Sequence, residues 1–108
     1  MKSKLLFALV LACAPAVAVA KGNIEEGKRK AETCKACHGE GGAKPVLPEY
    51  PILAGQHADY LAAALNQYKS GKRKNALMTG FSAALSPQDI RDLAAYFAAE
   101  KSPLQYKY

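Results

Sequence analysis

Residues that bind metals or form cross-links are scarce in this 108-residue chain, which has three cysteines, two histidines and two methionines. Two of the cysteines and one histidine fall within one short stretch, CKACH, at residues 34–38. No segment alternates polar and apolar residues over strand length, and no internal repeat or nucleic-acid recognition motif is present. These absences argue against a strand-rich or nucleic-acid-binding protein. They favour a small all-α domain whose chemistry is concentrated in CKACH.

A second long apolar run is also missing, and the one at the N-terminus is short. Lys2 and Lys4 precede an apolar run from Leu5 to about Ala14, and Ala18-Val19-Ala20 has the A-x-A form of a cleavage site. This pattern is typical of a secretory signal peptide, since the run is too short for a membrane anchor. We therefore expect removal of residues 1–20, which leaves residues 21–108 as one exported domain without a transmembrane segment.

Cys13 allows a different processing of the same leader. In Val10-Leu11-Ala12-Cys13 it has the position of the acylated cysteine of a bacterial lipoprotein. Leu11 is unusual before such a cysteine, and the A-x-A site further on is good, so plain secretion is favoured. The mass of the mature protein distinguishes the two.

Three helices are predicted in the domain, joined by loops rich in Pro and Gly. The first extends from the N-cap Asn23, with Glu26 completing a capping box, to Gly39. The second covers His57 to Ser70, and the third follows the N-cap Ser86, with Pro87 and Asp89 in its first turn. The segment from Asn75 to Ser82 reads as poorly helical and is expected to be a loop.

Four explanations of CKACH can be weighed. A disulfide between Cys34 and Cys37 would close a tiny loop, and a structural zinc lacks a second pair of ligands. A redox dithiol requires its cysteines at a helix N-terminus after a strand, whereas this motif ends a predicted helix. C-x-x-C-H is the attachment sequence of haem c. Two thioethers from Cys34 and Cys37, with His38 as an axial iron ligand, are therefore the favoured interpretation.

The identity of the second axial ligand of the iron distinguishes an electron carrier from a protein that binds small molecules at the iron. Met78 is the single methionine after the leader, and a thioether ligand raises the reduction potential, as suits an electron carrier. His57 is the competitor and would give bis-histidine ligation. Its position before a predicted helix is that of an exposed cap, so Met78 is favoured.

Several motifs together resemble class I cytochromes c. These are CKACHG, Pro51-Ile52-Leu53-Ala54-Gly55-Gln56, Tyr60-Leu61, Met78, Leu85-Ser86-x-x-Asp89-Ile90 and Leu93-Ala94-x-Tyr96. They are most similar to the small single-haem bacterial c553 and c5 proteins and to one half of the dihaem cytochromes c4. The resemblance implies three to four short helices around one covalently bound haem c, since a second C-x-x-C-H is absent.

The resemblance also implies roles for individual residues. His38 would be the proximal and Met78 the distal iron ligand, and the Pro51 carbonyl would accept a hydrogen bond from the second ring nitrogen of His38. Gly27 would let the first helix cross the last closely, near Tyr96 and Phe97. Candidates for holding the haem propionates are Tyr60, Lys72, Arg73 and Asn75.

The expected function is one-electron transfer between redox proteins in the periplasm, without catalysis. A basic cluster at residues 69–74 fits a solvated turn or a patch that attracts acidic partners. Two alternatives share the same haem domain. The chain would then be the haem subunit of a periplasmic dehydrogenase or reductase, or a gas-binding or peroxidase-type protein with an open iron site.

Overall fold

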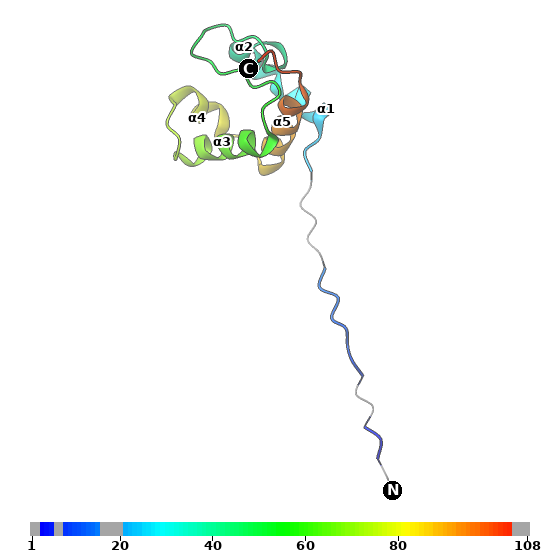
Figure 1. Cartoon of the computed structure of the whole chain (residues 1–108). Coiled ribbons are helices and arrows are strands. Elements are labelled where there is room, and N and C mark those ends of the chain that lie inside the picture. Colours follow the sequence, from blue (N-terminus) through cyan, green and yellow to red (C-terminus); the bar gives the residue numbers. More distant parts are fainter. Residues whose placement is uncertain (1–2, 6–7, 16–20, 105–108) are drawn as a thin grey trace, which may run out of the picture.

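The computed structural model describes residues 3–5, 8–15 and 21–104 (Figure 1). Within these ranges the secondary structure is entirely helical and no strand occurs, which confirms the predicted all-α class. In chain order the elements are α1 (Ile24–Lys30), the 3-10 turn η1 (Ala31–Thr33), α2 (Lys35–His38), the 3-10 turn η2 (Glu40–Gly42), α3 (Ala58–Ser70), α4 (Ala76–Ser82) and α5 (Pro87–Ala99).

The first predicted helix is correctly located but is not continuous. It divides into α1, η1 and α2, and Gly39 ends it with a φ of 81°. Asn23 caps α1 by accepting a hydrogen bond from the Glu26 amide, but the predicted capping box is incomplete. The Asn23 amide instead donates to the carboxylate of Asp92 at 2.8 Å. The start of α1 is thereby attached to α5.

Helices α1 and α5 cross at Gly27, which is buried. A Cβ atom placed on Gly27 would lie 2.0 Å from the Asp92 carbonyl oxygen and 2.7 Å from Cβ of Tyr96. The close crossing expected at Gly27 is therefore present, and it lies against Tyr96 and the backbone of Asp92. Only glycine permits this approach, because any side chain would hold the two helices apart.

Helix α3 occupies the predicted segment, and α5 begins where predicted. His57 precedes α3, and Gly71 ends it in the left-handed conformation, with a φ of 80°. Ser86 and Asp89 form a complete capping box at the start of α5. Leu61 of α3 packs with residues of α5 in the main buried cluster, which comprises Ala31, Leu61, Leu93, Ala94, Tyr96 and Phe97. Figure 1 shows α3 passing beside α5 and continuing toward α4.

The prediction of a loop from Asn75 to Ser82 is wrong, because residues 76–82 form α4. Asn75 caps this helix, and its side-chain oxygen accepts a hydrogen bond from the Met78 amide at 3.1 Å. Thr79 and Gly80 lower the helical propensity of the segment, which concealed the helix from a sequence-based prediction. Packing against α3 supplies the stability that propensity does not.

Two sequence predictions lie partly outside the described residues. The A-x-A site at residues 18–20 and the last four residues of the predicted domain are among those for which no structure is described. Among the residues that are described, no helix has the length and apolar character needed to cross a bilayer.

Candidate functional site

A cavity of about 480 Å³ lies between α2, α3, α4, α5 and the loop before α3. Its volume falls in the range of roughly 300–1,000 Å³ found for cofactor and ligand sites. Apolar side chains make up much of its wall, including Ile52, Leu53, Leu61, Leu65, Leu93 and Phe97. A flat, largely apolar group that displaced water from these walls would therefore bind with a favourable free energy.

All three functional residues of CKACH line this cavity. Backbone hydrogen bonds from Cys37 and His38 to the Cys34 carbonyl, at 3.2 Å and 3.0 Å, wind the motif into a helical turn. The turn places Cys34, Cys37 and His38 on the same wall. Burial raises the pKa of the Cys34 thiol, with Thr33 opposing the shift through a hydrogen bond. A raised pKa is the reverse of what a reactive redox dithiol requires.

His38 is held by one hydrogen bond that also fixes its proton. The ring is buried, with 6% of the residue exposed, and its Nδ1 lies 2.8 Å from the carbonyl oxygen of Pro51. A carbonyl oxygen can only accept, so Nδ1 carries the hydrogen and the neutral ring keeps its lone pair on Nε2. His38 thus offers Nε2 as a metal ligand, and the Pro51 contact implied by the family resemblance is present.

Met78 reaches the same cavity from α4. It is half-buried, and its backbone amide is tied to Asn75. Leu77 and Phe81 of the same helix also line the cavity, as the spacing of one helical face allows. The soft thioether of Met78 and the imidazole of His38 therefore come from two separate elements that enclose one space.

The polar edge of the cavity is built around Arg73. Its guanidinium lies 3.4 Å from the Tyr60 hydroxyl and 5.2 Å from the ring centre of Tyr68. Tyr60, Arg73 and Asn75 all line the cavity, whereas Lys72 does not. His57, the competing axial ligand, is exposed at the start of α3 and is also absent from the lining.

Sequence reasoning missed part of this site. Tyr50, Leu77 and Phe81 line the cavity without having been singled out. Tyr50 also lies near His38, with ring centres 6.2 Å apart. Reading residues 76–82 as a helix would have found Phe81, which is three residues from Met78 and so on its face. No sequence signal marks Tyr50, because it lies in an irregular loop.

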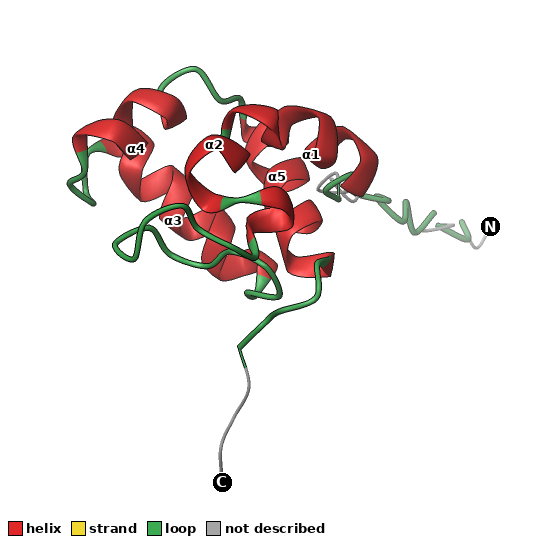
Figure 2. Cartoon of the chain, turned by 90° about the horizontal axis from the view of Figure 1, so that it is seen from above, coloured by secondary structure: helices red, strands yellow, loops and turns green. Residues whose placement is uncertain are grey.

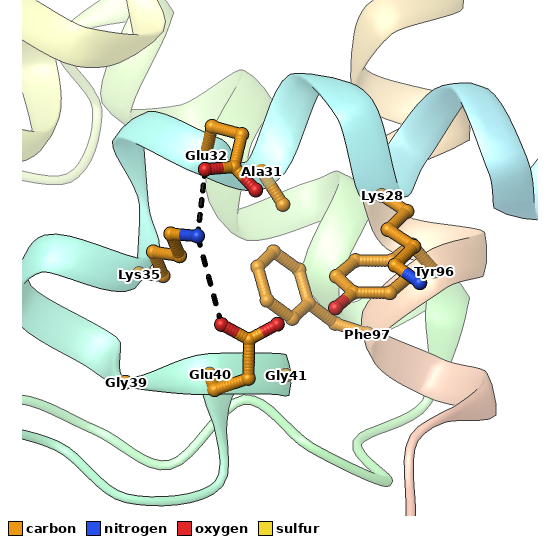
Figure 3. Close-up of a pocket in the computed structure, with 9 residues that line it drawn as sticks. All are labelled: Lys28, Ala31, Glu32, Lys35, Gly39, Glu40, Gly41, Tyr96 and Phe97. Carbon is orange, nitrogen blue, oxygen red and sulfur yellow. Dashed lines mark ion pairs between the residues drawn. The ribbon is translucent and has the colours of Figure 1, made fainter.

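A second, shallow depression lies between α1, α2 and α5 (Figure 3). Along the edge of this depression, Lys35 forms ion pairs with Glu32 at 2.7 Å and with Glu40 at 3.7 Å. The rings of Tyr96 and Phe97 form the floor of the depression. All three charged side chains are largely exposed, so these ion pairs are weak. The depression offers no enclosed volume for a ligand.

Solved structures define the class of the fold. Reduced cytochrome c4 from Pseudomonas stutzeri superimposes with a TM-score of 0.72 at 38% identity, over 79% of this chain and 49% of that one. A thiosulfate dehydrogenase from Marichromatium purpuratum gives a TM-score of 0.71 at 31% identity, over 88% of this chain and 23% of that one. The fold is that of a class I cytochrome c, as the sequence motifs implied.

Sequence comparison gives the family. The cytochrome c family matches residues 24–99. Cytochrome c4 of Pseudomonas aeruginosa is 44% identical over 92% of this chain, and cytochrome c-554(548) of Halomonas halodenitrificans is 42% identical over 74% of it. The chain belongs to the cytochrome c family. It spans about half the length of the cytochrome c4, 49%, but 99% of cytochrome c-554(548).

The residues of the cavity fit a haem. Two thiols, an imidazole with its lone pair on Nε2 and a thioether are brought to one apolar space. Imidazole and thioether are a known axial pair for haem iron. Arginine, tyrosine and asparagine side chains at the edge provide hydrogen-bond donors for the two carboxylates of the ring.

Proposed function

We propose that this protein carries single electrons in the periplasm on one haem c that is joined to Cys34 and Cys37 and ligated by His38 and Met78. The observation that carries the proposal is the convergence of these four side chains on one cavity. The haem supplies a reversible one-electron change at its iron. The protein supplies the attachment, the ligands and the dry surroundings.

Each lining residue has a distinct task in this proposal. The Pro51 carbonyl holds the His38 proton on Nδ1 and so keeps Nε2 available. Arg73, Tyr60 and Asn75 bind the propionates, while Lys72, which does not line the cavity, is not required. The apolar walls exclude water, which favours the reduced state.

The proposed domain limits agree with the packing at Lys21 and Gly22. The Lys21 carbonyl accepts a hydrogen bond from Gln88 of α5, and Gly22 lies against the backbone of Arg91. These contacts make Lys21 and Gly22 part of the packed domain, which supports the proposed cleavage after residue 20. Mass spectrometry of the mature protein tests this boundary, and a lipid-modified Cys13 would contradict it.

A visible absorption spectrum tests the ligands most directly. The oxidised wild-type protein is expected to show the methionine-to-iron charge-transfer band, and a pyridine haemochrome one haem c per chain. Met78→His should remove the band and lower the potential by on the order of 100 mV. His57→Ala is the matched control and should change neither. An unchanged spectrum and potential in Met78→His would contradict the assignment, as would rapid carbon monoxide binding by the reduced wild-type protein.

A second candidate function is that of a haem subunit in a dehydrogenase or reductase complex. The similarity to part of a thiosulfate dehydrogenase favours it. Co-purification with a catalytic partner at fixed stoichiometry would support this role, and a monomeric protein that reduces several acceptors would support a free carrier.

A further inference from the structure

The Pro51 carbonyl, which accepts the proton of His38, lies in a segment without a helix of its own. Residues 51–57 contain a single turn, in which the Gln56 amide donates to the Leu53 carbonyl at 3.2 Å. The position of the Pro51 carbonyl therefore depends on contacts with other parts of the chain. A hydrogen bond weakens steeply when its geometry departs from the optimum, so these contacts govern how firmly His38 is held.

Two backbone carbonyl groups anchor this segment. The Gly42 carbonyl of η2, which follows CKACH, accepts hydrogen bonds from the amides of Leu53 and Ala54 at 2.8 Å and 3.2 Å. The Phe97 carbonyl, in the last turn of α5, accepts one from the Gly55 amide at 2.9 Å. The first anchor joins the segment to the end of CKACH, and the second joins it to the end of α5.

The chain that leaves α5 packs directly against Gly55. A Cβ atom placed on Gly55 would lie 2.6 Å from Cβ of Ser102, 3.1 Å from its amide nitrogen and 3.3 Å from the Glu100 carbonyl oxygen. The Glu100 amide donates to the same Phe97 carbonyl at 3.2 Å. Figures 1 and 2 show the loop before α3 and the chain after α5 on the same side of the domain. Residues 100–102 thus hold the turn at Gly55 against α5.

Gly55 meets two separate requirements at this contact. Its φ is 75°, a backbone conformation that side chains disfavour, and its lack of a side chain leaves room for Ser102. Gly71 has a similar φ of 80°, but a Cβ placed on Gly71 would meet no described atom within 4 Å. The two glycines therefore share the backbone requirement and differ in the contact.

We propose that Gly55 and residues 100–102 are positioning residues for His38, and that they set the strength of its hydrogen bond to the Pro51 carbonyl. This inference rests on the proposed electron-carrier function. A stronger hydrogen bond at Nδ1 increases the electron density that Nε2 gives to the iron, which favours the oxidised state and lowers the reduction potential. Residues 100–102 therefore influence the potential although none of them lines the cavity.

A double-mutant cycle on the holoprotein tests this coupling. Gly55→Ala places a Cβ against Ser102 and should displace the turn, so that the His38 Nδ1–H of the reduced protein exchanges with solvent about tenfold faster and the potential rises. Ser102→Gly removes the opposing Cβ. Gly55→Ala combined with Ser102→Gly should therefore recover much of the wild-type exchange rate and potential. Proton NMR measures the exchange, and voltammetry measures the potential.

Gly71→Ala is the matched control, because it introduces the same disfavoured backbone conformation without the contact. It should lower the free energy of unfolding, as Gly55→Ala does, and leave the His38 exchange rate and the potential at their wild-type values. If Gly55→Ala matches Gly71→Ala in both readouts, Gly55 contributes to stability alone and the proposal is wrong. A double variant that behaves like Gly55→Ala would also overturn it, since residues 100–102 would then have no part.

A measurement on the wild-type holoprotein applies even if Gly55→Ala does not retain haem. In dilute denaturant, the Gly55 amide and the His38 Nδ1–H should be exposed by one local opening, and their exchange should depend equally on denaturant concentration. Unequal dependences in a haem-loaded wild type would refute this inference alone. A wild type without haem c would refute the proposed function and the inference with it.

Discussion

At the scale of single residues, Asp92 illustrates how a buried charge can be fully satisfied. It is 2% exposed and accepts hydrogen bonds from the Asn23 amide, the Gln88 side chain and, at 2.6 Å, the Lys30 ammonium. Lys30 also pairs with Asp89 at 2.8 Å. These contacts favour the ionised carboxylates and lower the pKa of both Asp89 and Asp92 to about 2, chiefly through the hydrogen bonds from Lys30.

The lowered pKa values predict an acid-sensitive stability. A carboxylate with a lowered pKa in the folded protein stabilises it above the unfolded pKa near 4, and this contribution disappears as the pH falls through the folded pKa near 2. The free energy of unfolding should therefore decrease between about pH 4 and pH 2. Asp92→Asn should lose about 2 kcal/mol at neutral pH and show a shallower decrease in acid.

Chemical denaturation at several pH values measures both effects. Glu25→Gln is the control, since Glu25 is exposed and its side chain makes no hydrogen bond or ion pair with any described residue. It should follow the wild-type curve. If Asp92→Asn has the same acid slope as wild type, the contacts between Lys30 and Asp92 do not contribute as described.

The sequence was most informative where single residues carry the chemistry. Covalent attachment of haem c requires one fixed spacing, so the sequence alone predicts this role for CKACH. Asp92 could not be recognised, because its three partners come from α1, α5 and the residue before α1. Such a network depends on how the helices cross, and local pattern alone does not encode it.

At the scale of elements, α4 determines how Met78 is presented. The Asn75 side chain caps the helix at the Met78 amide, and such a cap contributes about 1 kcal/mol. Asn75→Ala should therefore weaken α4 and increase displacement of Met78 by added imidazole about fivefold. Absorbance spectroscopy of the oxidised protein during an imidazole titration measures this displacement.

A conservative variant separates capping from carboxylate binding at Asn75. Asn75→Asp keeps an oxygen that can cap α4 but brings a negative charge to the rim of the cavity. If capping dominates, its imidazole affinity should stay near that of wild type. If Asn75→Asp is affected more strongly than Asn75→Ala, the main role of Asn75 is hydrogen bonding to the propionates.

Helices with strong end signals were predicted well, and weakly marked ones were not. Ser86, Pro87 and Asp89 gave α5 its start, and Gly71 gave α3 its end. Helix α4 has a good N-cap, but Thr79 and Gly80 have low helix propensity and reduce the intrinsic stability of the helix. Its formation depends on contact with α3, which a single-sequence pattern does not reveal.

At the scale of the whole molecule, the cofactor is expected to form much of the core. The buried hydrophobic residues of the described chain are few, and three of them are small alanines. The full set is Ala31, Ala54, Leu61, Ile90, Leu93, Ala94, Tyr96 and Phe97. Leu53 and Leu65 are only partly buried and face the cavity. A domain of this size with so little buried apolar surface has little stability of its own.

Loss of the haem should therefore destabilise the entire domain. Cys34→Ala with Cys37→Ala, produced without haem, is expected to show little cooperative thermal unfolding by circular dichroism, unlike the holoprotein. Adding haem to this variant should restore part of the helical signal. A sharp unfolding transition in the haem-free variant would show that the protein core suffices without the cofactor.

Residues 60–88 contain four basic residues and no acidic residue, whereas residues 21–59 and 89–108 together are neutral. This uneven charge has a consequence for diffusion, because a body whose excess charge lies at one end experiences a torque in an electric field as well as a pull. Near a negatively charged partner, the protein would therefore rotate until α4 and its turn lead the approach. Such alignment before contact reduces the random reorientations in each encounter, which matters most for a carrier that must bind and leave many times.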